Sequence, residues 1–135
     1  MKFNVCITLL IFTLFSCSKD NEFRIPDVYV DYRVTLQEFQ IKNVNRVLIV
    51  NNHGVSGLII YHRPDNVYVA YDLCSSVNPE KKCAVELGGP SLTVTDPCSG
   101  AKFSLYDGTP VKAPATRPLK QYQVTVSNSV ISVIN

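Results

Sequence analysis

Hydrophobic and polar positions alternate with a period of two over much of the chain that follows residue 24. In residues 28–34 every second side chain is apolar or aromatic, a spacing typical of a strand with one buried face. Further short runs of β type, separated by turn-forming residues, lie at 47–50, 57–61, 67–72, 84–87, 92–95, 102–106, 121–126 and 130–134. About nine short strands with frequent turns and no long helical period predict an all-β fold, either a small sandwich or a small barrel.

Three stretches lack this pattern. Residues 36–45 are polar and compatible with a loop that contains a helical turn, and residues 73–82 form a loop around Cys74 and Pro79. Residues 107–119 contain a turn at Gly108 followed by three prolines. Glycine and proline mark turns and irregular connections, so we expect no regular element in this last segment.

The first residues differ from the rest. Lys2 precedes an apolar run at 5–15, which is too short to cross a bilayer core of roughly 30 Å and indicates a signal peptide. The sequence Leu-Phe-Ser-Cys at 14–17 resembles the lipobox of bacterial lipoproteins, in which cleavage precedes the Cys and lipid is attached to it. The expected organisation is a signal peptide at 1–16, lipidated Cys17 and a tether at 17–24, and a β domain at 25–135. The alternative is an ordinary signal peptide that leaves Cys17 as a free thiol.

This N-terminus implies a location. Acyl chains on Cys17 would hold the protein on a membrane without a spanning helix, because each buried methylene contributes about 0.8 kcal/mol. The polar residues at 18–22 resemble the segment that follows the lipidated Cys in some surface-exposed lipoproteins. We therefore expect a lipid-anchored protein of the cell envelope, on the outer membrane and facing the periplasm or the outside. Disulfides persist there.

Charge excludes one class of partner. The chain has 13 Lys and Arg against 11 Asp and Glu, for a formal net charge of +2, and no basic run longer than Lys81-Lys82. Binding of nucleic acid needs a basic stripe or patch. We therefore expect no nucleic-acid partner.

Five cysteines limit the possible disulfides. Cys6 would leave with the signal peptide, and Cys17 is the expected anchor. Cys74, Cys83 and Cys98 remain, an odd number that allows one bridge and one free thiol.

The stretch from residue 67 to residue 133 contains an ordered series of short motifs: Tyr71-Asp72-Leu73-Cys74, Asp96-Pro97-Cys98-Ser99-Gly100, Phe103, Asp107-Gly108, Ala113-Pro114-Ala115, Pro118-Leu119 and Tyr122. Their order and spacing resemble those of a Rieske domain, the β fold that holds a [2Fe–2S] cluster between two loops. Family members have Cys-x-His in the first loop and Cys-x-x-His-Gly in the second. The resemblance covers about half of the chain and implies a Rieske-like sandwich or barrel; residues 25–66 look, less specifically, like the opening strands of Rieske-like bacterial lipoproteins.

The ligand positions depart from the family pattern. Cys74 matches the first Cys, but Ser76 stands at the first His, Asp96 at the second Cys and Ser99 at the second His. A Rieske cluster needs two thiolates on one iron and two imidazoles on the other. The resemblance therefore implies a degenerate site, with no resident metal or cofactor expected, and with [2Fe–2S] as the cofactor only if the site is still competent.

The resemblance also bears on the disulfide. Some Rieske proteins carry a second Cys in each loop, and these two pair to clamp the loops together; Cys98 stands at that position in the second loop. The favoured pairing is Cys83–Cys98, which would close a loop of fifteen residues and contribute about 3 kcal/mol in the chain-entropy estimate. The runner-up is Cys74–Cys98. On the favoured pairing, Cys74 is a small buried residue.

Catalytic motifs are absent from the sequence pattern. His53 and His62 both precede the first loop and have no acid partner nearby in sequence, and Asp72 and Asp107 are expected to be solvated surface acids. No catalytic residue is predicted, and the protein is not expected to be an enzyme. The favoured hypothesis is a cluster-less module that binds an envelope protein partner; the alternatives are an electron-transfer protein with atypical ligands and a thiol enzyme acting through Cys74 or Cys98.

The anchor gives a first prediction. Replacing Cys17 by Ala removes the lipid attachment site, so the protein should move from the membrane fraction to the soluble fraction. Fractionation of cells that express the wild type and Cys17→Ala measures this. Continued membrane partition of the variant would contradict the lipobox.

Overall fold

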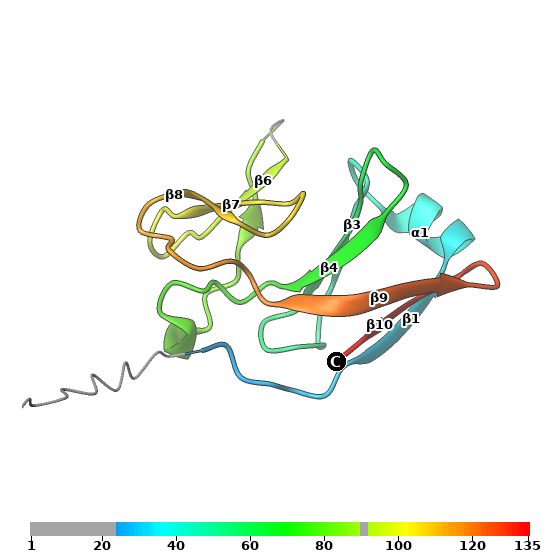
Figure 1. Ribbon diagram of the computed structural model, residues 1–135, viewed down its shortest axis with the longest axis horizontal. Coiled ribbons are helices and arrows are strands. Elements are labelled where there is room, and N and C mark those ends of the chain that lie inside the picture. Colours follow the sequence, from blue (N-terminus) through cyan, green and yellow to red (C-terminus); the bar gives the residue numbers. More distant parts are fainter. Residues whose placement is uncertain (1–23, 90–91) are drawn as a thin grey trace, which may run out of the picture.

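The computed structural model describes residues 24–89 and 92–135, which contain ten strands in two antiparallel sheets (Figure 1). The predicted signal peptide at 1–16 and the lipidated Cys17 lie outside the described residues. Within the described part, no helix is long and apolar enough to span a membrane. The all-β expectation is confirmed, with ten strands in place of about nine.

The larger sheet has six strands in the order β1-β10-β9-β4-β3-β2. Its strands are β1 (Asp31–Thr35), β2 (Val47–Val50), β3 (Leu58–His62), β4 (Tyr68–Asp72), β9 (Gln121–Ser127) and β10 (Val130–Ile134). The turn between β9 and β10 has positive φ angles at Asn128 and Ser129, the backbone of a tight hairpin turn. The outer strand β1 pairs with β10, so the two ends of the domain meet in one sheet edge.

One helix, α1 (Leu36–Lys42), follows β1 directly. Thr35 caps it, because its hydroxyl accepts a hydrogen bond from the backbone N–H of Glu38 at 3.0 Å. Thr35 and Glu38 have the spacing of a capping box, so the sequence held a helix-start signal in a segment predicted to be mostly loop. The helix buries Phe39 against one face of the larger sheet, among Val34, Ile60 and their neighbours.

The smaller sheet has four strands in the order β5-β6-β7-β8. They are β5 (Glu86–Leu87), β6 (Thr93–Thr95), β7 (Lys102–Ser104) and β8 (Pro110–Lys112). Strand β8 was not predicted, because it begins with Pro110 inside the proline segment. It lies at the edge of the sheet, where the missing N–H of a proline at the first position of a strand does no harm.

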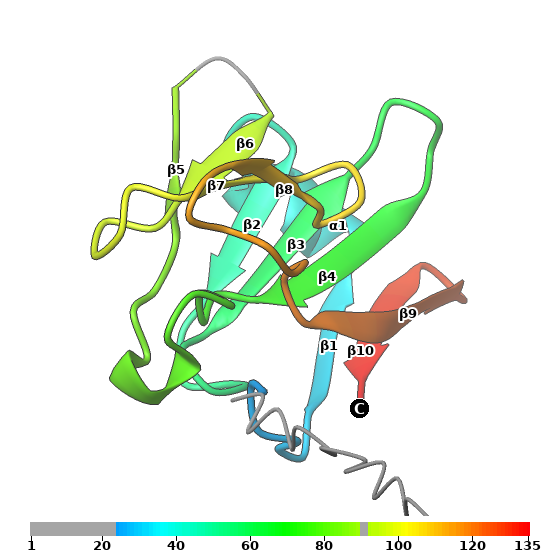
Figure 2. The same cartoon turned by 60° about the vertical axis from the view of Figure 1, so that its left-hand side comes forward.

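The main core lies between the two sheets. Tyr61 and Tyr71 on strands β3 and β4 share one cluster of buried side chains with Phe103 of β7; Figure 2 shows the smaller sheet in front of these strands. The alternate residues of β3 and β4, such as Ile60 and Ala70, face the α1 side. Both faces of the central strands are therefore covered, which explains why β3 reads as a continuous apolar run.

Gly108 allows the segment after β7 to pass over this core. Its φ is +76°, and a Cβ atom placed there would lie 2.8 Å from Cε1 of the buried Tyr71 ring. Its backbone also donates to Ser104 and accepts from Leu119, both at 2.9 Å. The close approach and the positive φ both require glycine at this position.

Two glycine variants separate these two requirements. Gly100 has the same φ of +76°, but a Cβ atom added there would meet no other atom within 4 Å. Gly100→Ala should therefore lower the free energy of unfolding by about 1–2 kcal/mol, the cost of a left-handed backbone. Gly108→Ala should lower it by about 1–3 kcal/mol more, because the added methyl meets a buried ring. Urea unfolding of both variants measures the difference, and equal losses would contradict the contact with Tyr71.

Candidate functional site

Two loops between strands meet at the end of the molecule where the Rieske resemblance places a cluster. The first follows β4 and contains the short helix η1 (Pro79–Lys81); the second joins β6 to β7. The first loop closes on itself, because the N–H of Ser75 donates to the carbonyl of Cys83 at 2.8 Å and Cys74 pairs with Ala84 in an isolated bridge. The second loop is a tight turn, in which the N–H of Gly100 donates to the carbonyl of Asp96 at 2.8 Å.

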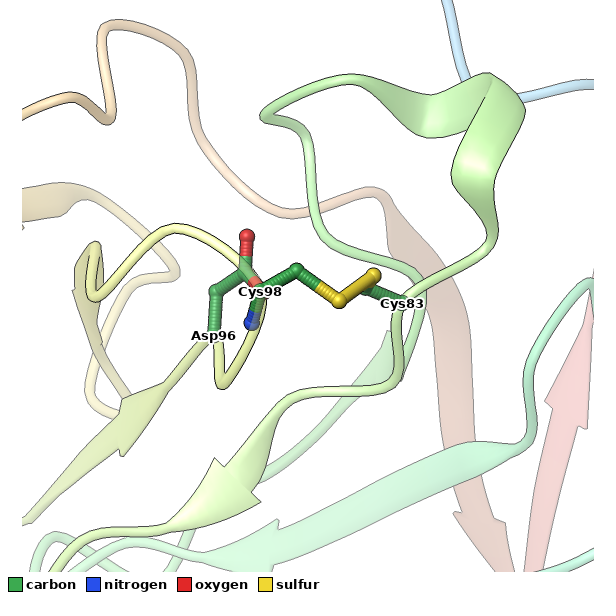
Figure 3. Close-up of side chains that lie close together, drawn as sticks. All are labelled: Cys83, Asp96 and Cys98. Carbon is green, nitrogen blue, oxygen red and sulfur yellow. A yellow bond between two sulfur atoms is a disulfide. The ribbon is translucent and has the colours of Figure 1, made fainter.

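A disulfide joins these loops. Cys83 of the first and Cys98 of the second are bonded with their Cα atoms 6.3 Å apart (Figure 3). This is the favoured of the two pairings considered from the sequence. Cys74 remains a free thiol and is buried.

The carboxylate of Asp96 forms a second link between the loops. Asp96 is fully buried. Its Oδ2 accepts from the hydroxyl of Ser75 in the first loop at 2.7 Å and from that of Ser99 in its own loop at 2.6 Å. Its Oδ1 accepts from the N–H of Cys98 at 2.8 Å. Burial raises the pKa of Asp96, but the hydrogen bonds from Ser99, Ser75 and the backbone outweigh it, so the pKa lies below its ordinary value.

A second buried carboxylate, that of Asp72, holds the base of the first loop. It accepts from the backbone N–H groups of Val55, Ser56 and Cys74 at 2.6, 3.1 and 2.7 Å, and from the hydroxyl of Tyr122 at 2.7 Å. Burial, and then the hydrogen bond and charge of Asp72, raise the pKa of Tyr122. The expectation of a solvated Asp72 was wrong. Its position at the end of an apolar strand could not show that a turn from another hairpin would cover it.

Gly54 explains how that turn can approach Asp72. A Cβ atom on Gly54 would overlap Oδ2 of Asp72, and the φ of Gly54 is +67°. No larger residue fits there without displacing the carboxylate. The Asn-Asn-His-Gly turn after β2 therefore also covers the buried carboxylate of Asp72.

The free thiol of Cys74 is not activated. Its Sγ lies 3.7 Å from the carbonyl oxygens of Ser75 and Pro79. Burial, the largest effect, raises the pKa of Cys74; the negative charge of Asp72 raises it further, against a hydrogen bond with Ser56. A reactive or metal-binding cysteine needs its thiolate, and this environment favours the neutral thiol.

Ser76 points to a different partner from Ser99. Its hydroxyl donates to the backbone carbonyl of Arg117, in the proline-rich segment, at 2.7 Å. Two surface grooves, of about 480 and 360 Å³, meet along this contact and share Ser76, Pro79 and Arg117 in their linings. The proline segment thus forms a third wall beside the two loops.

The four predicted ligand positions do not form a metal-binding set. Asp96 and Ser99 are joined by a hydrogen bond, whereas the hydroxyl of Ser76 donates to the proline segment and Cys74 does not belong to the group of potential ligands between the loops. Among the described residues, the one group of three or more His, Cys, Asp or Glu with ligand atoms within 4.8 Å of one another is Cys83, Asp96 and Cys98. The donors at the four positions are therefore a poor match for the two thiolates and two imidazoles that a Rieske cluster requires.

The histidines offer no replacement. His62 ends β3 and stacks on Tyr68, with ring centroids 4.2 Å apart. His53 packs edge-on against Tyr32 at 5.0 Å. Both rings are held by aromatic contacts of the larger sheet, and neither belongs to the group of potential ligands between the loops.

The Asp96 network gives a prediction about acid stability. Because the pKa of Asp96 is lowered in the folded state, the unfolded state binds more protons in acid, and this stabilisation is lost as the pH falls below about 4. Asp96→Asn should lower the free energy of unfolding at pH 7 by about 1.5–3 kcal/mol, the range for hydrogen bonds to a charged group. The variant should also lose less of its remaining stability than the wild type between neutral pH and about pH 3.

Chemical unfolding at several pH values measures both effects. Asp31→Asn is the control, since Asp31 is an exposed residue whose ion pair with Arg33 lies on the surface. Such pairs contribute about 0–1 kcal/mol. An acid dependence of Asp96→Asn as steep as that of the wild type would contradict this role of Asp96.

Comparison with known proteins supports the fold. No protein-family model and no curated protein matches the chain. Similar solved structures include the cyanobacterial plasma membrane Rieske protein PetC3 from Synechocystis PCC 6803, with a TM-score of 0.58 and 24% identity over 79% of this chain and 98% of that one. A chain of the complex of reduced oxygenase and oxidized ferredoxin in carbazole 1,9a-dioxygenase has a TM-score of 0.53 and 22% identity, over 77% of this chain and 92% of that one.

A third similar structure is the ferredoxin of carbazole 1,9a-dioxygenase from Nocardioides aromaticivorans IC177. It has a TM-score of 0.52 and 19% identity, over 79% of this chain and 97% of that chain. Likeness at this level of identity is evidence of fold and not of activity. The protein has a Rieske-like fold.

Proposed function

We propose that the protein is a Rieske-like module that carries no [2Fe–2S] cluster and acts by binding a protein partner in the cell envelope, where lipid on Cys17 anchors it. The module uses the Rieske-like frame as a scaffold. Its loops are cross-linked by a disulfide and a buried carboxylate. On this proposal it is not an enzyme.

The observation that carries this proposal is the set of hydrogen bonds at the ligand positions. Asp96 accepts from Ser75 and Ser99, at 2.7 and 2.6 Å. Ser76 donates to the carbonyl of Arg117 at 2.7 Å. At three of the four positions, the side-chain oxygen atoms are therefore used in hydrogen bonds that hold the structure. Oxygen ligands suit hard cations, whereas iron–sulfur clusters need soft ligands such as thiolates.

The grooves beside Ser76 supply a candidate surface for the partner. The larger one combines apolar residues such as Ile25 and Leu119 with the polar residues Asp27, Ser76 and Lys120. A mixture of apolar area and a few polar groups is typical of protein interfaces. The groove also begins next to the residues that follow the predicted tether, so it would lie on the membrane-proximal part of an anchored protein.

The second candidate is an electron-transfer protein that holds [2Fe–2S] with unusual ligands. The retained Rieske-like frame favours it, and a Rieske protein and a dioxygenase ferredoxin share that frame. The lack of a second thiolate and of both imidazoles at the matching positions disfavours it. The two candidates differ in a property that can be measured directly.

Iron and sulfide analysis separates them. The full chain, purified in mild detergent from cells that assemble iron–sulfur proteins, should be colourless and contain no stoichiometric iron or acid-labile sulfide. The matched control is the triple variant Ser76→His, Asp96→Cys and Ser99→His, which restores the family's ligand types. Cluster uptake by this variant under the same conditions would show that the cells can load the fold. Two irons and two sulfides per wild-type chain would overturn the proposal and establish the electron carrier.

A further inference from the structure

Three potential metal ligands converge where the two loops meet. The Sγ atoms of Cys83 and Cys98 and a carboxylate oxygen of Asp96 all lie within 4.8 Å of one another. Figure 3 shows that the disulfide bridges the two loops and that the Asp96 carboxylate lies beside Cys98. Two thiols and a carboxylate form a ligand set that Zn²⁺ accepts, but the two sulfurs are bonded to each other in this structure.

The loops are held in place by contacts other than the disulfide. The hydroxyl of Ser75 in the first loop donates a hydrogen bond to Oδ2 of Asp96 in the second loop, at 2.7 Å. The backbone N–H of Ser75 also donates a hydrogen bond to the carbonyl of Cys83 at 2.8 Å, which fixes the backbone at Cys83. The N–H of Cys98 is fixed on Asp96 at 2.8 Å. The backbone positions of both cysteines therefore do not depend on the S–S bond alone.

A reductant can approach the disulfide from the protein surface. Cys98 is exposed and Cys83 is partly exposed, whereas Asp96 beside them is buried. A dithiol reductant, such as a protein with a Cys-x-x-Cys pair, can therefore reach Cys98. It would transfer two electrons and two protons to the bridge and become a disulfide itself.

We infer that reduction of the Cys83–Cys98 bridge converts this group into a Zn²⁺ site whose protein ligands are Cys83, Cys98 and Asp96. Binding forms two Zn–S bonds and one Zn–O bond, and it releases the two thiol protons to solvent. Water completes the fourth position of the tetrahedron. The site goes beyond the proposed function and does not depend on it.

Distances are compatible with this site. Zn–S bonds of about 2.3 Å and Zn–O bonds of about 2.0–2.2 Å place tetrahedral ligand atoms roughly 3.6–3.8 Å apart. The ligand atoms already lie within 4.8 Å of one another, so the carboxylate needs only a small movement. The sulfurs separate by side-chain rotation, for which Cα atoms 6.3 Å apart leave room. Ser75 and Ser99 then orient the carboxylate through hydrogen bonds, as outer-shell residues do in metal sites.

Metal titration of the untagged full chain in detergent tests the inference. Co²⁺ is the spectroscopic probe, because tetrahedral Co²⁺ with thiolate ligands absorbs in the visible and near ultraviolet. The reduced protein should bind one Co²⁺ per chain with these bands, and one Zn²⁺ should displace it. The oxidised protein should show neither event.

Variants test the ligand assignment. Cys83→Ser with Cys98→Ser should abolish the thiolate bands, and Asp96→Asn should weaken Zn²⁺ binding by at least roughly tenfold. Glu80→Gln, an acid in the first loop outside the group, and Cys74→Ala should leave the affinity within about twofold.

A folded, reduced wild type that binds neither metal would overturn the inference. So would unaltered binding by the double serine variant, strong loss in Cys74→Ala, or unfolding of the wild type on reduction, as judged by circular dichroism.

Discussion

Two buried carboxylates determine how the loops of this protein are placed. A buried charge must be hydrogen-bonded, and Asp72 meets this need by drawing together the turn at Val55 and Ser56, the first loop at Cys74, and Tyr122 on β9. Asp96 does the same for the first loop at Ser75 and the second loop at Ser99. Because Cys74 and Ser75 are neighbours, the two networks form one connection from β9 to the second loop. Removal of the Asp72 or the Asp96 carboxylate would leave its buried hydrogen-bond donors without an acceptor.

This arrangement gives the loops two cross-links that need no metal. The disulfide joins Cys83 to Cys98, and the hydroxyl of Ser75 joins the carboxylate of Asp96. The bridge stabilises the fold chiefly by limiting the unfolded chain, whereas the Asp96 network acts on the folded state. In a Rieske domain the cluster itself ties the two loops together. The proposed absence of a cluster is therefore consistent with ordered loops.

Local patterns made the strands predictable, and long-range contacts made the rest unpredictable. Period-two alternation located β9 and β10, and a continuous apolar run located β2 with its observed bounds. Strand β8 was missed because Pro110 reads as irregular chain, although an edge position tolerates it. The buried Asp72 was missed for a different reason. Its burial comes from a turn in an earlier hairpin, at Gly54, where only a missing Cβ leaves room for the carboxylate, and no local pattern of charge or hydropathy reports such a contact.

The serines at two of the predicted ligand positions form different contacts, one inside the second loop and one at the surface. Ser99 turns inward to Asp96, while Ser76 reaches the carbonyl of Arg117 and brings the proline segment against the first loop. Ser99 therefore binds the buried carboxylate inside its own loop, whereas Ser76 and Arg117 lie together in the lining of a surface groove. The positions that the Rieske resemblance assigns to metal ligands thus supply hydrogen bonds to the loops and part of the groove on which partner binding is proposed.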